Sequence, residues 1–177
     1  QKYAKGIYDF FKDFDDSQIK KGIDSNKGEG LIFVLGMPRS GTTLLESILY
    51  TSSDLVPGGE KSFFTLQLFE FITSLANQDN VNFDLDFAKQ LGDRYLENIK
   101  AQRGNVKFFV DKLPENYLFY KFIRLSLPGA KFIHCHRDPW DNAISLYKQN
   151  YSINIFYASS FFGIANELAN YEHLIQF

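Results

Sequence analysis

The stretch LIFVLGMPRSGTT, residues 31–43, decides the fold. Its apolar run 31–35 is expected to form a strand that is buried on both faces of a sheet. Residues 36–41 form a glycine-rich turn, and residues 42–50 have the character of a helix. Such a turn typically binds phosphate, because the first N–H groups of the helix are unpaired and the helix dipole adds positive charge there.

The loop offers an anion several donors but lacks the lysine of nucleotide hydrolases. ATP- and GTP-binding loops have the pattern G-x-x-x-x-G-K-[ST], and Thr42 stands here at the lysine position. Arg39 supplies a planar cation suited to two oxygens, and Thr42 and Thr43 add hydroxyl groups. Because that lysine contacts the β and γ phosphates in hydrolases, we expect a less charged terminal group here, such as the sulfuryl group of a phosphosulfate. The alternative is an ordinary strand-to-helix turn.

Strands and helices alternate along the chain, which predicts a parallel sheet covered by helices on both faces. The predicted fold class is therefore α/β, a three-layer α/β/α arrangement of the P-loop type with a central parallel sheet. Further strands are expected at 107–111 and 130–136. Helices are expected at 3–20, 42–50, 61–76, 83–101, 114–126, from Pro139 onward and at 157–177, with a linker at 21–30 and a loop at 51–60.

Composition narrows the function classes. The 177 residues are 45% hydrophobic, enough for a sizeable core, and the net charge of −2 gives no reason to expect a nucleic-acid partner. Cys135 is the single cysteine, which excludes an internal disulfide and suits a reducing compartment. No apolar stretch approaches the ~20 residues of a membrane span. The chain begins at Gln1 without a charged and then apolar leader, and we expect a fragment that lacks targeting segments.

Two motifs together resemble a known family. The first, IFVLGMPRSGTTLLESIL, looks like the 5′-phosphosulfate loop of the sulfotransferases, which use 3′-phosphoadenosine 5′-phosphosulfate (PAPS). The second, FVDKLPENYLFYKFIRLSLPGAKFIHCHRDPWDNAISLYKQNY at 109–151, is similar to bacterial sulfotransferases that often carry tetratricopeptide repeats. It is more distantly similar to the protein-tyrosine sulfotransferases. The resemblance covers roughly residues 31–177.

The resemblance implies a domain organisation and a reaction. Residues 29–177 would be a partial sulfotransferase P-loop domain, truncated at its C-terminus, and residues 1–28 an N-terminal helical segment and linker. PAPS would be the co-substrate, with no metal. The acceptor would carry a hydroxyl group, on a peptide tyrosine, a carbohydrate or a small molecule. If the chain is bacterial, we expect it in the cytoplasm.

The resemblance also implies which residues hold the donor. Those expected at the 5′-phosphosulfate are Arg39, Ser40, Gly41, Thr42 and Thr43. The motif HRDPWDNAIS supplies Arg137 and Ser145 as the family's pair for the 3′-phosphate. Gly36 and Arg137 both directly follow predicted strands, and ligands sit at the carboxyl ends of parallel strands.

Two features of this second motif qualify the expectation. Tyrosine sulfotransferases place another arginine one turn beyond the serine, where this chain has Gln149. Arg137 could alternatively be a surface arginine paired with Asp138. Asp138 is the expected N-cap of the following helix, with Pro139 at its first position.

Two residues are expected to carry the chemistry. By resemblance, Glu60 in PGGEKS is the base that takes the acceptor's proton, and Lys112 neutralises charge on the bridging oxygen. Alternatively Glu60 caps the helix at 61–76, and Lys112 is an ordinary lysine at a strand end. Asp111 either holds Lys112 in place or caps the helix that Pro114 opens.

Other functions remain open from the sequence. A P-loop kinase or nucleotide hydrolase is one alternative, and a module that binds nucleotide without turnover is another. A metal site at His134, Cys135 and His136 is not expected, because the cysteine would point to the opposite face of the strand. Trp140 and the many phenylalanines are expected to pack in the core.

Overall fold

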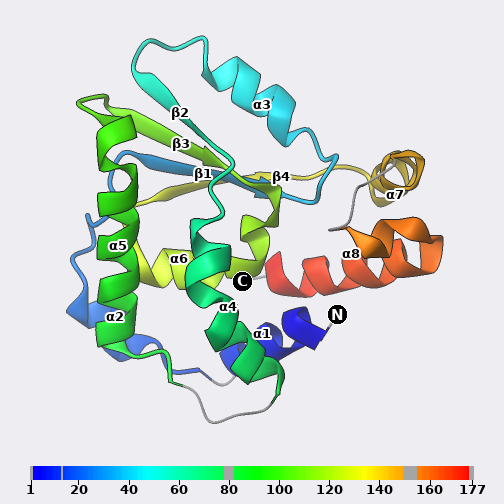
Figure 1. Cartoon of the computed structure of the whole chain (residues 1–177), viewed down its shortest axis with the longest axis horizontal. Coiled ribbons are helices and arrows are strands. Elements are labelled where there is room, and N and C mark those ends of the chain that lie inside the picture. Colours follow the sequence, from blue (N-terminus) through cyan, green and yellow to red (C-terminus); the bar gives the residue numbers. More distant parts are fainter. Residues whose placement is uncertain (1, 13, 78–81, 150–154, 176–177) are drawn as a thin grey trace.

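The computed structural model describes residues 2–12, 14–77, 82–149 and 155–175 (Figure 1). Its centre is a four-stranded, all-parallel sheet with strand order β2-β3-β1-β4. The strands are β1 (Leu31–Gly36), β2 (Leu55–Gly59), β3 (Phe108–Lys112) and β4 (Lys131–Cys135). The predicted α/β fold and the three predicted strands are confirmed.

Helices cover the sheet on both faces, as expected for a three-layer fold. In Figure 1, α3 lies on one side of the sheet, and α1, α4 and α6 lie on the other. The α-helices are α1 (Lys2–Lys12), α2 (Ser17–Gly22), α3 (Thr42–Leu49), α4 (Phe63–Ala76), α5 (Leu85–Arg103), α6 (Tyr120–Ser126), α7 (Pro139–Lys148) and α8 (Phe161–Ile175). Two 3₁₀ helices are η1 (Pro114–Phe119) and η2 (Phe156–Ser159).

The segment 51–60 was expected to be a loop, and that expectation is wrong. Its residues 55–59 form β2, which pairs with β3 at the edge of the sheet. Pro57 lacks a backbone N–H, and an edge strand is where a sheet tolerates a proline. The pairing shifts register between Pro57 and Gly59, and the strand ends at Gly59, directly before Glu60.

The N-terminal region also differs from expectation. One helix was predicted over 3–20, whereas the structure has α1 and α2, and the Asp15 side chain accepts a hydrogen bond from the N–H of Ser17 where α2 begins. Ile7 and Phe11 of α1 are buried in the same hydrophobic cluster as β1. The proposed division between residues 28 and 29 stays a prediction.

The C-terminal third follows the predicted order with shorter elements. The helix predicted over 114–126 is split into η1 and α6. The last helix, predicted from residue 157, begins at Phe161 after η2, and residues 176–177 lie outside the described part. Asp138 caps α7 as predicted, accepting hydrogen bonds from the N–H groups of Trp140 and Asp141.

Aromatic side chains fill the layer between the sheet and α4, α5 and α6. Phe33 of β1 has its ring 5.9 Å from Phe64 and 5.5 Å from Tyr95. A second group joins α1 to this layer, with Phe11 4.7 Å from Phe122. The core therefore explains the high phenylalanine content.

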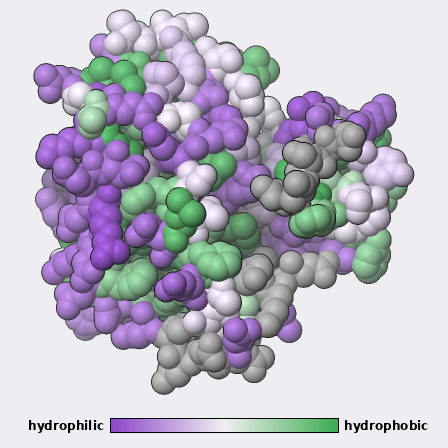
Figure 2. Space-filling model, viewed as in Figure 1, coloured by the Kyte–Doolittle hydropathy of each residue, from purple (hydrophilic) through white to green (hydrophobic). Residues whose placement is uncertain are grey.

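Some large apolar side chains nevertheless lie at the surface. Trp140 is 78% exposed, so the expectation that it packs in the core is wrong. Hydrophobic residues also gather over α4 in Figure 2, whereas the surface over α5 is mostly hydrophilic. Among the described helices, none combines the length and the apolar character that crossing a membrane requires.

Candidate active site

The loop between β1 and α3 has the backbone of an anion-binding turn. Gly41 is the N-cap of α3 and has φ of 102°, which a side chain would disfavour. Arg39 has φ of 72°, and among the described residues it is the only one other than glycine with a positive φ. A non-glycine residue in this region carries strain, and such strain is concentrated at functional sites. The loop is therefore built for more than a chain reversal.

A cavity of about 540 Å³ opens at this loop. Seven of the nine residues predicted for the site line it. The lining consists of Pro38, Arg39, Ser40, Gly41, Thr42, Thr43, Glu60, Pro114, Glu115, Arg137 and Ile155. The two remaining predicted residues, Lys112 and Ser145, each contact a lining side chain. The fold thus gathers into one site residues that lie up to about a hundred positions apart in sequence.

One side of the cavity, here called the arginine side, consists of Arg39, Arg137 and Ser145. Its residues meet because β1 and β4 are parallel neighbours, with Gly36 opposite Cys135. Arg39 Nε donates a hydrogen bond to Ser145 Oγ at 3.2 Å, and Arg137 Nη1 donates to the carbonyl oxygen of Arg39 at 3.2 Å. Within the described ranges, neither guanidinium contacts a carboxylate.

The arginine side corrects one sequence-based alternative. Arg137 donates to the loop backbone, while Asp138 accepts hydrogen bonds at the start of α7. The two are therefore not the simple surface pair that was considered. Asn142, which the sequence did not single out, adds a bond from its Nδ2 to the carbonyl of Pro38 at 3.0 Å, so α7 is tied to the loop at a second point.

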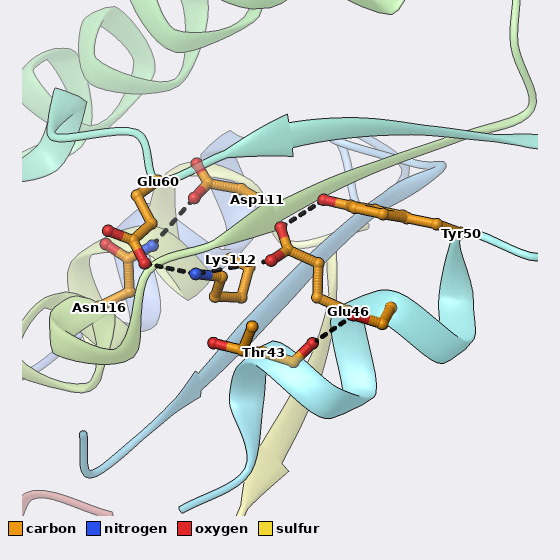
Figure 3. Close-up of polar contacts among 8 residues, drawn as sticks. Thr43, Glu46, Tyr50, Glu60, Asp111, Lys112 and Asn116 are labelled. Carbon is orange, nitrogen blue, oxygen red and sulfur yellow. Dashed lines mark hydrogen bonds and ion pairs between the residues drawn. The ribbon is translucent and has the colours of Figure 1, made fainter. Parts of the chain in front are cut away.

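The other side of the cavity, here called the lysine side, consists of Lys112, Glu46 and Glu60. Figure 3 shows the Lys112 ammonium between the two carboxylates. Lys112 Nζ donates to Glu60 Oε1 and lies 3.5 Å from Glu46 Oε2, and the Tyr50 hydroxyl donates to Glu46 Oε1. The side chains of Lys112 and Glu46 are 8% and 12% exposed, whereas that of Glu60 is 57% exposed.

The environment of Lys112 favours its charged form. Burial by itself would lower the pKa of the Lys112 ammonium, but the hydrogen bonds and charges of Glu60 and Glu46 outweigh burial and raise that pKa. Glu115, a further carboxyl group in the cavity wall, has its pKa raised by burial and by the nearby charge of Glu60. Glu115 is therefore a second group that could exchange protons in the cavity.

Two sequence-based alternatives for these residues are wrong. Glu60 does not cap α4, because Ser62 is the N-cap residue and the Glu60 carboxylate contacts Lys112. Asp111 neither holds Lys112 nor caps η1, whose N-cap is Leu113. Asp111 and Lys112 are consecutive on β3 and therefore point to opposite faces of the sheet.

Asp111 belongs to the core rather than to the cavity. It is 1% exposed, and it accepts hydrogen bonds from Tyr95 Oη at 2.7 Å and from Asn116 Nδ2 at 3.4 Å. Figure 3 shows the bond from Asn116. Burial raises the pKa of the Asp111 carboxyl to about 7, although bonds from Tyr95, the Lys61 backbone and Asn116 act in the opposite direction.

The sequence missed Glu46 and Glu115. Glu46 lies one helical turn after Thr42, so the two share a face of α3, and Thr42 is buried at the loop. The four-residue spacing of Thr42 and Glu46 could be read from the sequence. It did not show which face of α3 would contact β3. Glu115 follows Pro114 closely after Lys112, and nothing in its position alone distinguished a cavity wall from a surface turn.

The histidines lie outside the cavity lining. His134 shares a hydrogen bond with the hydroxyl of Tyr171 on α8, and its ring lies 6.1 Å from that of His136. In the part of the chain that the structure describes, no three histidine, cysteine, aspartate or glutamate side chains are grouped so that they could hold a metal ion.

Comparison with known proteins assigns the chain to a family. The sequence model of the sulfotransferase family matches residues 32–176, which include both sides of the cavity. An uncharacterised protein of Aquifex aeolicus is 36% identical over 130 residues, which are 68% of this chain and 17% of that protein.

A second relative has a more specific name. A putative protein-tyrosine sulfotransferase of Caenorhabditis briggsae is 33% identical over 116 residues, which are 62% of this chain and 40% of that protein. The chain thus spans less than half the length of either relative.

Proposed function

The chain belongs to the sulfotransferase family, and from that premise we propose that it transfers a sulfuryl group from PAPS to an acceptor hydroxyl. The observation that carries this proposal is the division of one cavity into two sides. Two arginines without carboxylate partners in the described chain stand at one side, and a carboxylate–lysine–carboxylate cluster stands at the other. Such a cavity suits an anionic donor next to a group that takes a proton.

The loop residues fit the 5′ end of the donor. Thr42 and Thr43 line the cavity at the start of α3, where unpaired N–H groups and the two hydroxyls can donate hydrogen bonds to a bound anion. Ser40 Oγ is buried and has no hydrogen-bond partner among the described residues. A buried hydroxyl without a partner costs free energy, which a bound oxyanion would recover. Arg39, Ser40, Gly41, Thr42 and Thr43 are therefore proposed to hold the 5′-phosphosulfate.

The 3′-phosphate is proposed to bind Arg137 and Ser145. Both stand beside Arg39 at the same edge of the sheet, where one ligand can contact all three. The Nη1 of Arg137 is satisfied by the loop carbonyl, which leaves the rest of its planar guanidinium for a second phosphate. Gln149 replaces the arginine that tyrosine sulfotransferases carry nearby, so this grip would depend more on Arg137.

Glu60 and Lys112 are proposed to carry out the transfer. As the acceptor oxygen bonds to sulfur, the bond from sulfur to the bridging oxygen breaks, and Glu60 takes the hydroxyl proton. Lys112 neutralises the charge that remains on the departing phosphate. Glu60 is exposed enough to meet an acceptor, and its contact with Lys112 brings base and cation together.

The geometry disfavours a kinase or nucleotide hydrolase. Such enzymes use the loop lysine for phosphate and an acidic residue for Mg²⁺. Thr42 stands in place of the lysine, and Asp111, the candidate acid at a strand end, points into the core toward Tyr95. Measured transfer from PAPS distinguishes an enzyme from a module that binds nucleotide without turnover.

The first experiment identifies the nucleotide. Thermal denaturation is followed with 3′-phosphoadenosine 5′-phosphate (PAP) and, separately, with ATP and Mg²⁺. We expect PAP to stabilise the chain and Arg137→Met to remove most of that stabilisation. Arg94→Met is the matched control, since Arg94 is exposed on α5 and contacts Gln67. Stabilisation by ATP with Mg²⁺ alone would overturn the donor assignment.

The second experiment identifies the base. Transfer of radiolabelled sulfate from PAPS is measured on a tyrosine peptide, a carbohydrate and a simple phenol, with Glu60→Gln and Glu115→Gln in parallel. Loss of transfer in Glu60→Gln supports the proposal, and loss in Glu115→Gln alone would move the base to Glu115. Glu97→Gln is the control, because Glu97 lies on the exposed surface of α5.

A further inference from the structure

Lys112 does not itself line the cavity. The lining includes Glu60 but not Lys112, and the Lys112 side chain is 8% exposed. Figure 3 shows the Glu60 carboxylate on one side of the ammonium and Glu46 on the other. Lys112 is therefore joined to the cavity through its contact with Glu60.

A second carboxylate, that of Glu46, contacts the Lys112 ammonium on the side opposite Glu60. Glu46 projects from α3 with a nearly buried side chain, and its Oε2 lies 3.5 Å from Lys112 Nζ. Its other oxygen, Oε1, accepts the hydrogen bond of the Tyr50 hydroxyl. Each carboxylate oxygen of Glu46 thus has one partner, and the side chain is fixed at both ends of its carboxylate.

We propose that Glu46 is the positioning residue for Lys112: it keeps the ammonium charged and in place at the cavity wall while Glu60 releases it to receive the acceptor's proton. This inference rests on the proposed sulfuryl transfer. It assigns a role to Glu46, which the sequence analysis did not single out. The Tyr50 hydroxyl supports that role by its hydrogen bond to the Glu46 carboxylate.

The need for such a residue follows from the balance of charge. During transfer the proton goes from the acceptor hydroxyl to Glu60, so Glu60 loses the negative charge that pairs with Lys112. A nearly buried ammonium without a carboxylate would be costly to keep charged. Glu46 lies on the opposite side of the ammonium from Glu60, so Lys112 keeps a carboxylate partner at the moment when the breaking bond leaves charge on the phosphate.

The position of Glu46 also links it to the donor loop. Glu46 lies one helical turn after Thr42, which is buried at the loop, and four residues before Tyr50, the C-cap of α3. The same short helix thus presents its N-terminus to the donor and one side chain to Lys112. Any shift of α3 on donor binding would move both together.

The test uses Glu46→Gln, which keeps the shape of the side chain but removes its charge. The Lys112 side chain is titrated by heteronuclear NMR of its ε-carbon and ammonium, with no nucleotide present. The groups that face Lys112 are Glu46 from α3, Glu60 after β2 and Glu115 from η1. Because Glu46 contributes to the raised pKa of Lys112, we expect that pKa to fall in Glu46→Gln. Glu46→Asp, which keeps the charge, should restore most of the difference.

The second readout is the rate at which PAPS is desulfated, measured against pH. In Glu46→Gln we expect the rate constant to fall about tenfold to a hundredfold, while KM for PAPS changes by less than about threefold. Lys112 must be charged to act, so the decline of activity at alkaline pH should begin at lower pH in Glu46→Gln. A merely structural role would lower stability without moving this limb of the pH profile. Glu97→Gln should leave both readouts unchanged.

The outcomes separate this inference from the proposed function. An unchanged Lys112 titration and an unchanged desulfation rate in folded Glu46→Gln would overturn the role of Glu46. If Glu46→Gln does not fold, Tyr50→Phe takes its place, since it frees one Glu46 oxygen and should shift the same titration in the same direction. If the parent chain does not consume PAPS, the proposed function fails, and the NMR titration still decides whether Glu46 holds Lys112.

Discussion

The cations on the arginine side and on the lysine side of the cavity differ in their exposure and in their contacts with carboxylates. Arg39 and Arg137 are exposed, and their contacts in the described chain are a hydroxyl and a carbonyl oxygen. Lys112 is nearly buried between the carboxylates of Glu46 and Glu60. A guanidinium stays charged without help, so it can wait for an external anion, whereas a buried ammonium needs carboxylates to remain charged.

The backbone differs between the two sides as well. Arg39 sits in an irregular loop with φ of 72°, whereas Lys112 closes the regular strand β3. The arginine side is therefore built by a strained turn at the carboxyl end of β1. The lysine side is built by regular elements, α3 and β3, whose side chains meet across the face of the sheet. The difference suggests that one side binds and the other reacts.

The largest expected effect is that of Lys112→Met, which tests whether the lysine side carries the reaction while the arginine side binds the donor. If the lysine side carries the reaction, PAPS turnover should fall about a thousandfold, while the Kd for PAP should rise by only about tenfold through the lost contact between Lys112 and the 5′-phosphate. Turnover is measured by the formation of PAP from PAPS, and Kd by calorimetry at fixed salt. Lys100→Met is the matched control, because Lys100 forms an exposed pair with Glu97 on α5. A loss of PAP binding as large as the loss of turnover would mean that both sides bind.

The second test concerns Asp111, the strand neighbour of Lys112 that faces the core. Burial raises the pKa of Asp111 to about 7 in the folded protein, whereas in the unfolded chain it ionises near pH 4. The folded state thus binds more protons over this interval, and the Asp111 contribution to stability falls as pH rises from about 4 to about 7. The expected loss is on the order of 4 kcal/mol.

Asp111→Asn is the variant that tests this dependence. Urea denaturation of parent and variant at a series of pH values gives the difference in the free energy of unfolding. Whatever its absolute stability, Asp111→Asn should become more stable relative to the parent as pH rises to 7. Above pH 7, the difference in the free energy of unfolding should level off. A difference that does not vary with pH would mean that Asp111 is charged in the fold, as Lys112 is on the other face.

The third test sharpens the picture of the arginine side. Arg39→Met and Arg137→Met should each weaken PAP binding about tenfold to a hundredfold, the value of a charge-assisted hydrogen bond. Calorimetry at two salt concentrations checks the affinity and its electrostatic origin. Arg94→Met should leave the affinity at the parent value. If only Arg39→Met weakens binding, the 3′-phosphate site is not at Arg137.

The smallest expected effect separates backbone strain from charge at Arg39. Both Arg39→Gly and Arg39→Ala remove the guanidinium, but only glycine adopts a φ of 72° without strain. Arg39→Gly is therefore expected to be about 1 kcal/mol more stable than Arg39→Ala. Thermal or urea denaturation measures the difference. Equal stability of the two variants would show that the loop relaxes in solution and that the arginine side is not strained.

Several features of the fold followed from local sequence. The apolar run at 31–35 predicted the central strand, and the Asp138–Pro139 pair predicted the start of α7. Strand β2 was missed because Pro57 and its neighbouring glycines lack strand propensity, and only pairing with β3 makes this segment a strand. Trp140 was misplaced because an aromatic residue early in a helix does not reveal whether that face is covered.

The candidate site shows the same limit. The loop at 36–43 could be recognised from sequence because its chemistry depends on neighbouring residues and on the start of one helix. Glu46 could not, because its role arises only when α3 is laid against β3 and its carboxylate meets Lys112. Glu115 became notable only when the fold placed it near Glu60 at the cavity wall.

The sequence by itself determined the strands β1, β3 and β4, the glycine-rich turn between β1 and α3, and the family, since each depends on short-range patterns of side chains and backbone. The tertiary structure alone decided which side chains from distant segments meet. It placed Arg137 against the loop of Arg39, turned Asp111 into the core and enclosed Lys112 between two carboxylates. The physical reason is that strand pairing and burial fix these contacts, and both are set by the packing of the whole chain rather than by any local segment.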